Sequence, residues 1–429
     1  MRGAGGVCGV RLVFPACGMQ RRPEALAVHE GWVMGLFKEV KKPVIKQGSS
    51  GSSEVSSHRP AYEEKTAPCI QSCPSGTDIR GWLVPLAQYK QYGKTPEQAF
   101  EIAWRKILEE NPFPAVCGRV CQHPCELNCN RKAKDGAVSI NKLEQFLGDY
   151  AVTNGLHAEL PADRKPAGLR VAVVGAGPAG LSAAYRLLRK GYAVTVFDAA
   201  PEPGGMMRYR IPRSIIPADI LDAEIANILR LGVELRSGTV VGRDISIDQL
   251  RRDYAAIYFA IGLQKPSLLQ VRPGSETEAA MAGELPADLP EIPAAAPDQV
   301  ENRQVNMVSP AIGQGRTVAD AIAAHFECCT ISTKPAHKAI RADKVKLDWY
   351  PAAPPVVTDS PVTGDQVLAE AARCMSCGMC MDCETCWMYC SKNCFVKLPK
   401  GEHYKLKLDL CNGCGKCAAS CPCGYIEMN

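Results

Sequence analysis

The segment from Arg170 to Asp198, RVAVVGAGPAGLSAAYRLLRKGYAVTVFD, constrains the fold of this chain more than any other. A short β-branched run ends at Gly175 and a helical pattern of apolar residues follows directly, which predicts a strand, a tight turn and a helix. A second apolar run, 193–197, leads to Asp198. This order is the dinucleotide-binding fingerprint, and it predicts a parallel, Rossmann-type sheet covered by helices.

The residues of this fingerprint have separate physical tasks. The first glycine permits the turn, the second lets backbone approach a ligand, and the third lets the helix pack on the strand. The helix start offers free N–H groups to a pyrophosphate, and the final acid would accept hydrogen bonds from a ribose. A coincidental glycine loop is the alternative, but strand, helix, second strand and acid all agree. The predicted cofactor-binding residues are Gly175, Gly177, Pro178, Ala179, Gly180 and Asp198.

Twenty-two cysteines recur at short spacings beside this nucleotide fold. Such spacing suits iron–sulfur clusters in a reducing compartment better than disulfides. In the first half of the chain, three residues separate each successive cysteine of a group, so the thiolates can converge on one cubane cluster. A zinc site is the alternative. The cysteines concerned are Cys69, Cys73, Cys117, Cys121, Cys125 and Cys129.

The second half of the chain carries two runs with the spacing of bacterial two-cluster ferredoxins. In such proteins the fourth cysteine of each run ligates the other cluster. We therefore expect two ligand sets, Cys380, Cys383, Cys386 with Cys421, and Cys411, Cys414, Cys417 with Cys390. The surplus cysteines are Cys374, Cys377, Cys394 and Cys423, and a slip of one repeat that makes Cys377 a first ligand is left open.

Composition excludes several other classes of protein. The net charge of +5 is small for 429 residues and is spread out, which argues against nucleic-acid binding. No apolar run is long enough to span a membrane, so a cytoplasmic protein is expected. No side-chain constellation for hydrolysis or acid–base catalysis stands out, and we expect no catalytic residue, since cofactors would carry the chemistry. His123 and His403 are expected to have packing or surface roles.

The stretch Glu202–Met206, EPGGM, together with Arg210-Ile211-Pro212, resembles the flavin half of the glutamate synthase small-chain family. This resemblance implies FAD rather than NAD at the fingerprint. It also implies a closing strand at Tyr258–Gly262 and, at Ser309–Arg316, a loop and helix start under the flavin ring. The further cofactor-binding residues that it implies are Gly204, Gly205, Arg210, Gly262, Ala311 and Ile312.

The stretch NPFPAVCGRVC at 111–121 resembles the iron–sulfur domain of the same family. The resemblance implies that Cys73, Cys121, Cys125 and Cys129 hold one 4Fe-4S cluster. A second cluster in that family uses an upstream cysteine pair, which this chain lacks, leaving Cys69 and Cys117 with Glu144 at the acidic ligand position. A solvated helix-face acid is the alternative for Glu144. With the ferredoxin runs, three clusters are expected, or four if this one forms.

Members of the family insert an NAD(P)H-binding domain where this chain has only residues 263–303, without a second glycine fingerprint or alternating apolar strands. That domain is therefore expected to be missing, which leaves direct NAD(P)H binding open. With the tract Cys386-Trp-Met-Tyr-Cys390, the chain most resembles the DsrL group of flavoproteins. This implies electron exchange between NAD(P)H and dissimilatory sulfite reductase through FAD and clusters. The alternatives are another partner, such as a glutamate synthase large chain or a hydrogenase, and a relay without nicotinamide activity.

The expected architecture is a multidomain α/β protein. Met34 is the expected natural start. The expected parts are a disordered tail at 1–60, a helical 4Fe-4S domain at 61–165, an FAD-binding Rossmann-type domain at 166–330, a linker at 331–372, and a ferredoxin-like domain with two 4Fe-4S clusters at 373–429.

Overall fold

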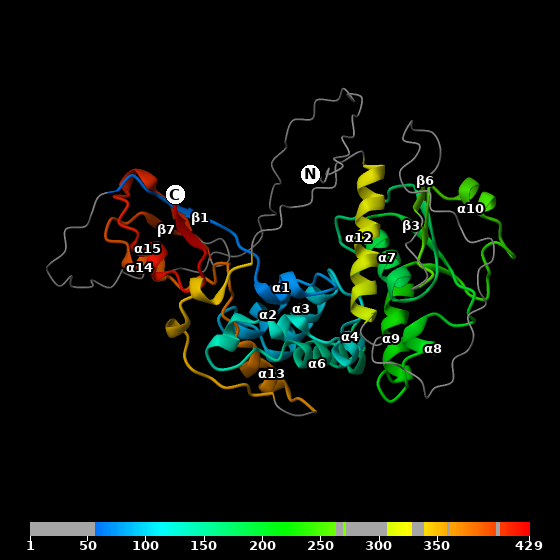
Figure 1. Cartoon of the computed structure of the whole chain (residues 1–429), viewed down its shortest axis with the longest axis horizontal. Coiled ribbons are helices and arrows are strands. Elements are labelled where there is room, and N and C mark those ends of the chain that lie inside the picture. Colours follow the sequence, from blue (N-terminus) through cyan, green and yellow to red (C-terminus); the bar gives the residue numbers. More distant parts are fainter. Residues whose placement is uncertain (1–55, 263–268, 272–306, 328–338, 358–360, 400–403) are drawn as a thin grey trace, which may run out of the picture. The chain divides into compact units, whose positions relative to one another are not determined.

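The computed structural model describes residues 56–262, 269–271, 307–327, 339–357, 361–399 and 404–429 (Figure 1). The chain divides into two units, Met1–Gly48 and Ser49–Asn429, and the first lies outside the described residues. The expected disorder at 1–55 and most of the expected domain loss at 263–303 also lie outside them.

A five-stranded sheet forms the centre of the nucleotide-binding part. Its order is β4-β3-β2-β5-β6, with β2, β3, β4 and β5 mutually parallel and β6 antiparallel to β5. The predicted strand–turn–helix–strand is confirmed. The strands are β2 (Arg170–Val174), β3 (Ala193–Phe197), β4 (Glu234–Arg236), β5 (Ala256–Phe259) and β6 (Leu269–Val271). The last of these strands lies within 263–303, where no alternating apolar strands of a second dinucleotide-binding domain are expected.

Alternate residues of β2 pack on opposite faces of this sheet, as its two-residue period requires. Val171 and Val173 join the large core beneath α7 (Pro178–Arg189), whereas Ala172 and Val174 join a smaller core with Leu250 of α10 (Ile247–Asp253). Helices α8 (Met206–Tyr209), α9 (Ala218–Leu229) and α12 (Val308–Phe326) complete this part.

The segment from Pro68 to Thr153 is helical, as predicted. Trp82, Trp104 and Leu147 are among its fully buried side chains. Two glycines bring α4 and α6 together, because a methyl group at Gly118 would lie 2.4 Å from Gln145 Cβ and one at Gly148 would lie 2.3 Å from the Ala115 nitrogen. The helices are α1 (Pro68–Ser72), α2 (Ile79–Ala87), α3 (Pro96–Ile107), α4 (Pro114–Val120), α5 (Pro124–Leu127), the 3₁₀ helix η1 (Asn130–Ala133) and α6 (Ile140–Thr153).

The predicted linker is partly integrated into this helical core. Its amphipathic segment forms α13 (Gly364–Ala371), and the buried side chains of Val367 and Ala371 belong to the same core as α2 and α6. Two 3₁₀ turns precede it, η2 (Ala342–Lys344) and η3 (Leu347–Trp349). Residues 331–372 therefore do more than connect two domains.

The C-terminal cysteine tract folds around two short helices and a hairpin. The second strand of the hairpin ends at Leu406, and a 3₁₀ turn follows it. Strand β1 (Pro60–Tyr62) pairs antiparallel with the last strand, with Pro60 opposite Met428, so the expected boundary near residue 60 divides a strand of this part. The elements are α14 (Thr385–Tyr389), β7 (Phe395–Lys397), β8 (Tyr404–Leu406), η4 (Leu408–Leu410), α15 (Lys416–Ser420) and β9 (Ile426–Met428).

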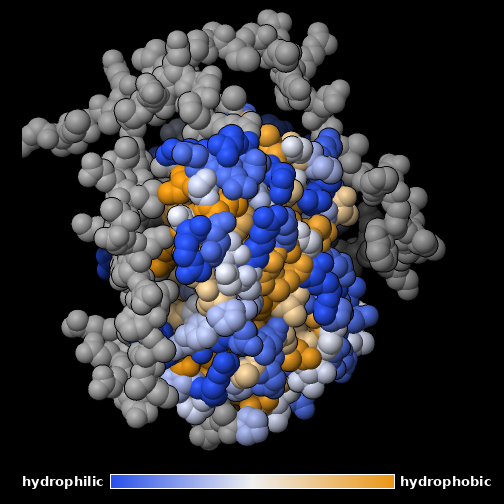
Figure 2. Space-filling model, turned by 90° about the vertical axis from the view of Figure 1, so that its right-hand side faces the viewer, coloured by the Kyte–Doolittle hydropathy of each residue, from blue (hydrophilic) through white to orange (hydrophobic). Residues whose placement is uncertain are grey.

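The surface in Figure 2 mixes hydrophilic and apolar residues, as is usual for a face in contact with solvent. In the part of the chain that the structure describes, no helix combines the length and the apolar character needed to cross a membrane.

Candidate cofactor sites

The glycine turn has the geometry that its sequence predicts. Gly175 has a φ of 110°, and its N–H donates to the Phe197 carbonyl oxygen over 2.7 Å. A methyl group at Gly175 would lie 2.4 Å from the Ala260 oxygen, and one at Gly180 would lie 1.8 Å from the Gly175 oxygen. Only glycine therefore allows the turn and the close packing of α7 on β2.

Gly177 leaves open space at the N-terminus of α7. A methyl group there would meet no heavy atom closer than Gly205 Cα at 4.0 Å. The φ of −81° is also accessible to other residues, so the protein backbone alone does not require a glycine here. The EPGG turn lies beside it, because the Gly204 N–H donates to the Ala176 oxygen over 2.8 Å. The free N–H groups of the helix start and this open space fit a pyrophosphate.

Asp198 is tied to the same turn. Its carboxylate accepts hydrogen bonds from the Ala176 N–H and, over 2.7 Å, from the Ala200 N–H. These bonds place the acid at the end of β3 next to the glycine turn, where the fingerprint requires it. Its contact with a ribose stays a prediction.

Arg208 is a structural residue of this site that sequence reasoning missed. Its Nε donates to the Pro203 oxygen over 2.6 Å, and its guanidinium pairs with Glu202 and Asp222. The side chain is 7% exposed, and its contacts with Pro203 and Glu202 hold the EPGG turn in place. No spacing rule points to it. Arg210 is the C-cap residue of α8, two residues after Arg208, and Gly262 has a φ of 95°. The cofactor contacts of Arg210 and Gly262 stay predictions.

The segment Ser309–Arg316, for which the resemblance implies a loop and a helix start, lies wholly within α12, so the structure has the helix but not the loop. The Ala311 N–H is used inside the helix, and the Ile312 oxygen accepts a hydrogen bond from Ser182 Oγ of α7 over 2.9 Å. The sequence pattern missed this helix extension because Pro310 and two glycines interrupt it. Contacts of Ala311 and Ile312 with a flavin stay predictions.

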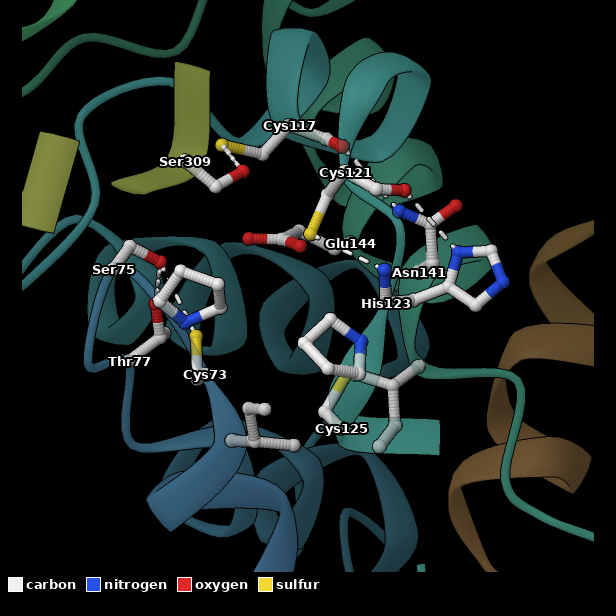
Figure 3. Close-up of a pocket in the computed structure, with 14 residues that line it drawn as sticks. Cys73, Ser75, Thr77, Cys117, Cys121, His123, Cys125, Asn141, Glu144 and Ser309 are labelled. Atoms are coloured by element: carbon white, nitrogen blue, oxygen red, sulfur yellow. Dashed lines mark hydrogen bonds between the residues drawn. The ribbon is translucent and has the colours of Figure 1, made fainter. Parts of the chain in front are cut away.

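A pocket in the helical part brings four cysteines and an acid together (Figure 3). Glu144 reaches this pocket from α6. Asn111 Nδ2 donates to the Glu144 carboxylate over 3.0 Å, and burial raises the pKa of this acid to about 7. Glu144 thus faces the pocket, which corrects the reading of a solvated acid. The cysteines that line it are Cys73, Cys117, Cys121 and Cys125.

The remaining N-terminal cysteines form a different group. Cys69 lies within electrostatic range of Cys129 but is not grouped with Cys117, which instead interacts with Glu144 and Cys121. Cys129 does not line the pocket that contains Cys73. The structure places Cys129 in the electrostatic surroundings of Cys69, and its part in the ligand set implied by the resemblance stays a prediction.

Both predicted ferredoxin-type groupings are brought together. Cys390, Cys411, Cys414 and Cys417 line one pocket, with Cys394 beside them. Cys380, Cys383 and Cys421 all lie in the electrostatic surroundings of Cys386. Cys423 is next to this second group, with its sulfur 3.7 Å from that of Cys421. Hydrogen bonding to Cys423 lowers the pKa of the Cys421 thiol to about 6.

Backbone amides point at the sulfur atoms, which is how proteins hold cluster thiolates. The amides of His123, Asp382 and Gly413 each donate to the cysteine two residues earlier over 3.3–3.4 Å. In the described residues, every non-glycine residue with positive φ follows a cysteine by one to three positions, and such strained positions concentrate at functional sites. These residues are His123, Ser376, Asp382, Glu384 and Asn393.

Burial raises the pKa of most of these thiols, to about 12 for Cys380 and about 11 for Cys417. Buried thiols of this kind stay protonated until a metal replaces the protons. Among the described residues, no three His, Cys, Asp or Glu side chains are close enough to hold a single metal ion. The cysteines instead line pockets, and this arrangement fits ligands placed around an iron–sulfur cluster.

Comparisons with known proteins agree with these sites. The model of the dihydropyrimidine dehydrogenase domain II, a 4Fe-4S cluster domain, matches residues 37–156, and the model of an NAD(P)-binding Rossmann-like domain matches residues 173–221. Both matches fall where the structure has its helical part and its glycine turn. The chain is therefore similar to proteins that combine a 4Fe-4S cluster domain with a nucleotide-binding Rossmann-like domain.

Three curated relatives are similar to this chain over part of their length. The beta subunit of NADP(+)-dependent formate dehydrogenase from Moorella thermoacetica is 38% identical over 48% of this chain and 31% of its own length. The subunit PreT of NAD-dependent dihydropyrimidine dehydrogenase from Escherichia coli is 35% identical over 50% of each. The glutamate synthase [NADPH] small chain from Bacillus subtilis is 34% identical over 45% of this chain and 40% of its own length. The chain spans at most half the length of these relatives.

Proposed function

We propose that this protein passes electrons between a two-electron donor, NAD(P)H, and a partner redox enzyme through FAD and 4Fe-4S clusters. When bound, flavin takes electrons in pairs and releases them singly, whereas each cluster carries one electron. The chain's own residues would hold these groups close together and away from water. The three relatives are named for nicotinamide-dependent activities, which supports this proposal.

One helix carries the proposal, because α12 touches both sites. A methyl group at Gly315 would lie 2.0 Å from the Ala179 oxygen at the start of α7. One at Gly313 would lie 2.1 Å from the oxygen of Pro74, the residue after Cys73. Ser309 of the same helix lies 3.6 Å from Cys117 Sγ. The backbone of the flavin fingerprint and that of the cluster pocket are thus separated by a single helix.

The cysteine groups supply the proposed clusters. In the helical part, Cys73, Cys121 and Cys125 would hold one cluster, with Glu144 or Cys117 as the fourth ligand. The C-terminal groups would hold two more in a ferredoxin-like fold, with Cys380, Cys383, Cys386 and Cys421 on one and Cys390, Cys411, Cys414 and Cys417 on the other. We propose dissimilatory sulfite reductase as the partner, on the resemblance of this C-terminal tract to the DsrL group.

Anaerobic mixing with NADH or NADPH tests the proposed donor. We expect the flavin absorbance to bleach first, followed by the absorbance of the clusters, since the donor delivers electron pairs. Flavin that stays oxidised with both nucleotides, but is reduced by dithionite, would contradict the nicotinamide activity. That outcome would favour a second candidate, a relay between protein partners, which the short segment 263–303 already supports.

Gly313→Ala tests whether α12 is the route between the sites. The added methyl group cannot occupy a position 2.1 Å from the Pro74 oxygen, so helix and cluster loop must move apart. We expect flavin reduction by the donor to be preserved and the transfer to the clusters to slow at least about tenfold, because coupling depends on close packing. Stopped-flow absorbance separates the two steps. Thr317→Ala, an exposed site on the same helix, should change neither rate.

A further inference from the structure

Cys374 and Cys377, surplus to the ferredoxin runs, share the backbone geometry of the cluster cysteines. Ser376, two residues after Cys374, has a φ of 46°. Positive φ occurs at the same position after Cys121, Cys380 and Cys411, at His123, Asp382 and Gly413. The turn at Cys374 therefore has the form of a ligand loop, although it precedes the ferredoxin runs.

The two N-terminal cysteines that lie outside the first pocket face this loop. Cys69 interacts electrostatically with Cys374, Cys129 and Cys377, and Cys377 interacts with Cys374 and Cys129. All four thiols are half-buried, and they come from three separate parts of the sequence.

Hydrogen bonds between neighbouring residues hold the three segments together. The Lys65 N–H donates to the Gly378 oxygen over 3.1 Å, which fixes the strand leading to Cys69 beside the loop. Arg131 Nη1 donates to the Arg373 oxygen over 2.6 Å, and Asn130 Nδ2 donates to the Ile340 oxygen over 2.9 Å. These contacts involve the residues adjacent to Cys129 and Cys374, so the grouping is built into the packing.

A buried arginine with two unpaired nitrogens lies next to this group. Arg80 is 5% exposed, and its Nε and Nη1 atoms have no hydrogen-bond partner. Arg80 and Arg131 both lie within electrostatic range of Cys374. Burying a cationic group with unpaired donors is unfavourable, so the position of Arg80 indicates an anionic group at the site. A cubane cluster with four thiolates carries net negative charge and supplies that group.

We propose that Cys69, Cys129, Cys374 and Cys377 hold an additional 4Fe-4S cluster beside Arg80. The Cys-x2-Cys pair that precedes the ferredoxin runs would thus complete a site whose other two ligands lie some 240 or more residues earlier in the chain. The site bridges the helical part and the C-terminal cysteine tract, where a cluster extends the proposed electron path. It does not depend on the nature of the electron donor or partner.

Iron analysis of the anaerobically purified full chain tests the site. With the three clusters proposed above, the parent protein should contain about sixteen irons. Cys374→Ser/Cys377→Ser should lower this to about twelve and remove one component of the electron paramagnetic resonance spectrum after dithionite reduction. Cys8→Ser/Cys17→Ser removes two thiols at the N-terminus and should leave iron content and spectrum unchanged.

Cys69→Ser supplies the decisive comparison. It should remove the same spectral component, and adding it to the double variant should cause no further loss of iron. The proposal would be overturned if the double variant kept all of its iron, or if the parent protein bound one zinc in place of this cluster. It would also be overturned if the double variant and Cys69→Ser lost different spectral components, which is the result expected if Cys377 serves a ferredoxin cluster instead.

Alkylation of the parent protein gives a reading that needs no substitution. Cys69, Cys129, Cys374 and Cys377 should be protected in the native protein and become reactive together as iron is released. Modification of Cys374 and Cys377 while all iron is retained would overturn the proposal. All of these readings measure iron and thiols, so they stand even if the protein proves inactive with NAD(P)H.

Discussion

Glu370→Ala is expected to lower the free energy of unfolding by about 3–5 kcal/mol, because it removes one acid of a buried ion pair and the acceptor of two amides. The Glu370 side chain is fully buried and pairs with Arg373, which is 2% exposed. It also accepts hydrogen bonds from the Ser139 N–H over 2.9 Å and the Val356 N–H over 2.7 Å. The substitution therefore leaves both amides without this acceptor and leaves Arg373 with Asp135 as its remaining acidic partner. Denaturant unfolding followed by circular dichroism measures the loss.

Asp343→Ala provides the matched control for this experiment. Asp343 pairs with Arg341, but the two side chains are 61% and 85% exposed, so the pair is worth less than about 1 kcal/mol. Equal losses in the two variants would contradict the role given to the buried network. Glu370→Gln should fall between them, since the amide oxygen keeps one acceptor while the charge is lost.

Gly177→Ala is expected to weaken FAD binding at least about tenfold, or about 1.4 kcal/mol, without destabilising the FAD-free protein. The protein alone has room for a methyl group at this position, and its φ of −81° suits alanine. The methyl group would instead occupy the space in which backbone and pyrophosphate meet. Titration of the FAD-free protein with FAD measures the affinity, and its thermal midpoint reports the fold.

Gly180→Ala should behave in the opposite way. Its methyl group would lie 1.8 Å from the Gly175 oxygen, so α7 cannot stay on β2. We expect the thermal midpoint of the FAD-free protein to fall along with FAD binding. Normal FAD affinity in Gly177→Ala, or a loss of stability as large as that of Gly180→Ala, would show that the open space is not the pyrophosphate site.

Much of the nucleotide site could be predicted because its signals are local. The strand, glycine turn and helix from Val171 to Arg189 follow from apolar period and from φ requirements that act over a few residues. The terminal acid Asp198 follows from the same short pattern. The ferredoxin-type groups could be predicted equally well, since most ligands of each group lie in one run of closely spaced cysteines.

Sites assembled from distant segments were not accessible in this way. Arg208 clamps the EPGG turn through contacts with Pro203 and Asp222, and no sequence spacing marks it. The approach of α12 to both cofactor sites depends on Gly313 and Gly315 meeting backbone from separate parts of the chain. Short-range patterns carry no information on such contacts, because packing determines them.

The sequence by itself determined that a dinucleotide turn and many metal-binding thiols occur in one chain, since both are encoded at short range. Only the tertiary structure decided which thiols share a space. It placed Cys129 within electrostatic range of Cys69, directed Glu144 into the pocket that Cys125 lines, and brought the pair at 374 and 377 near Cys69 and Cys129. The physical reason is that cluster ligands need only meet in space, and burial and hydrogen bonds between remote segments determine where they meet.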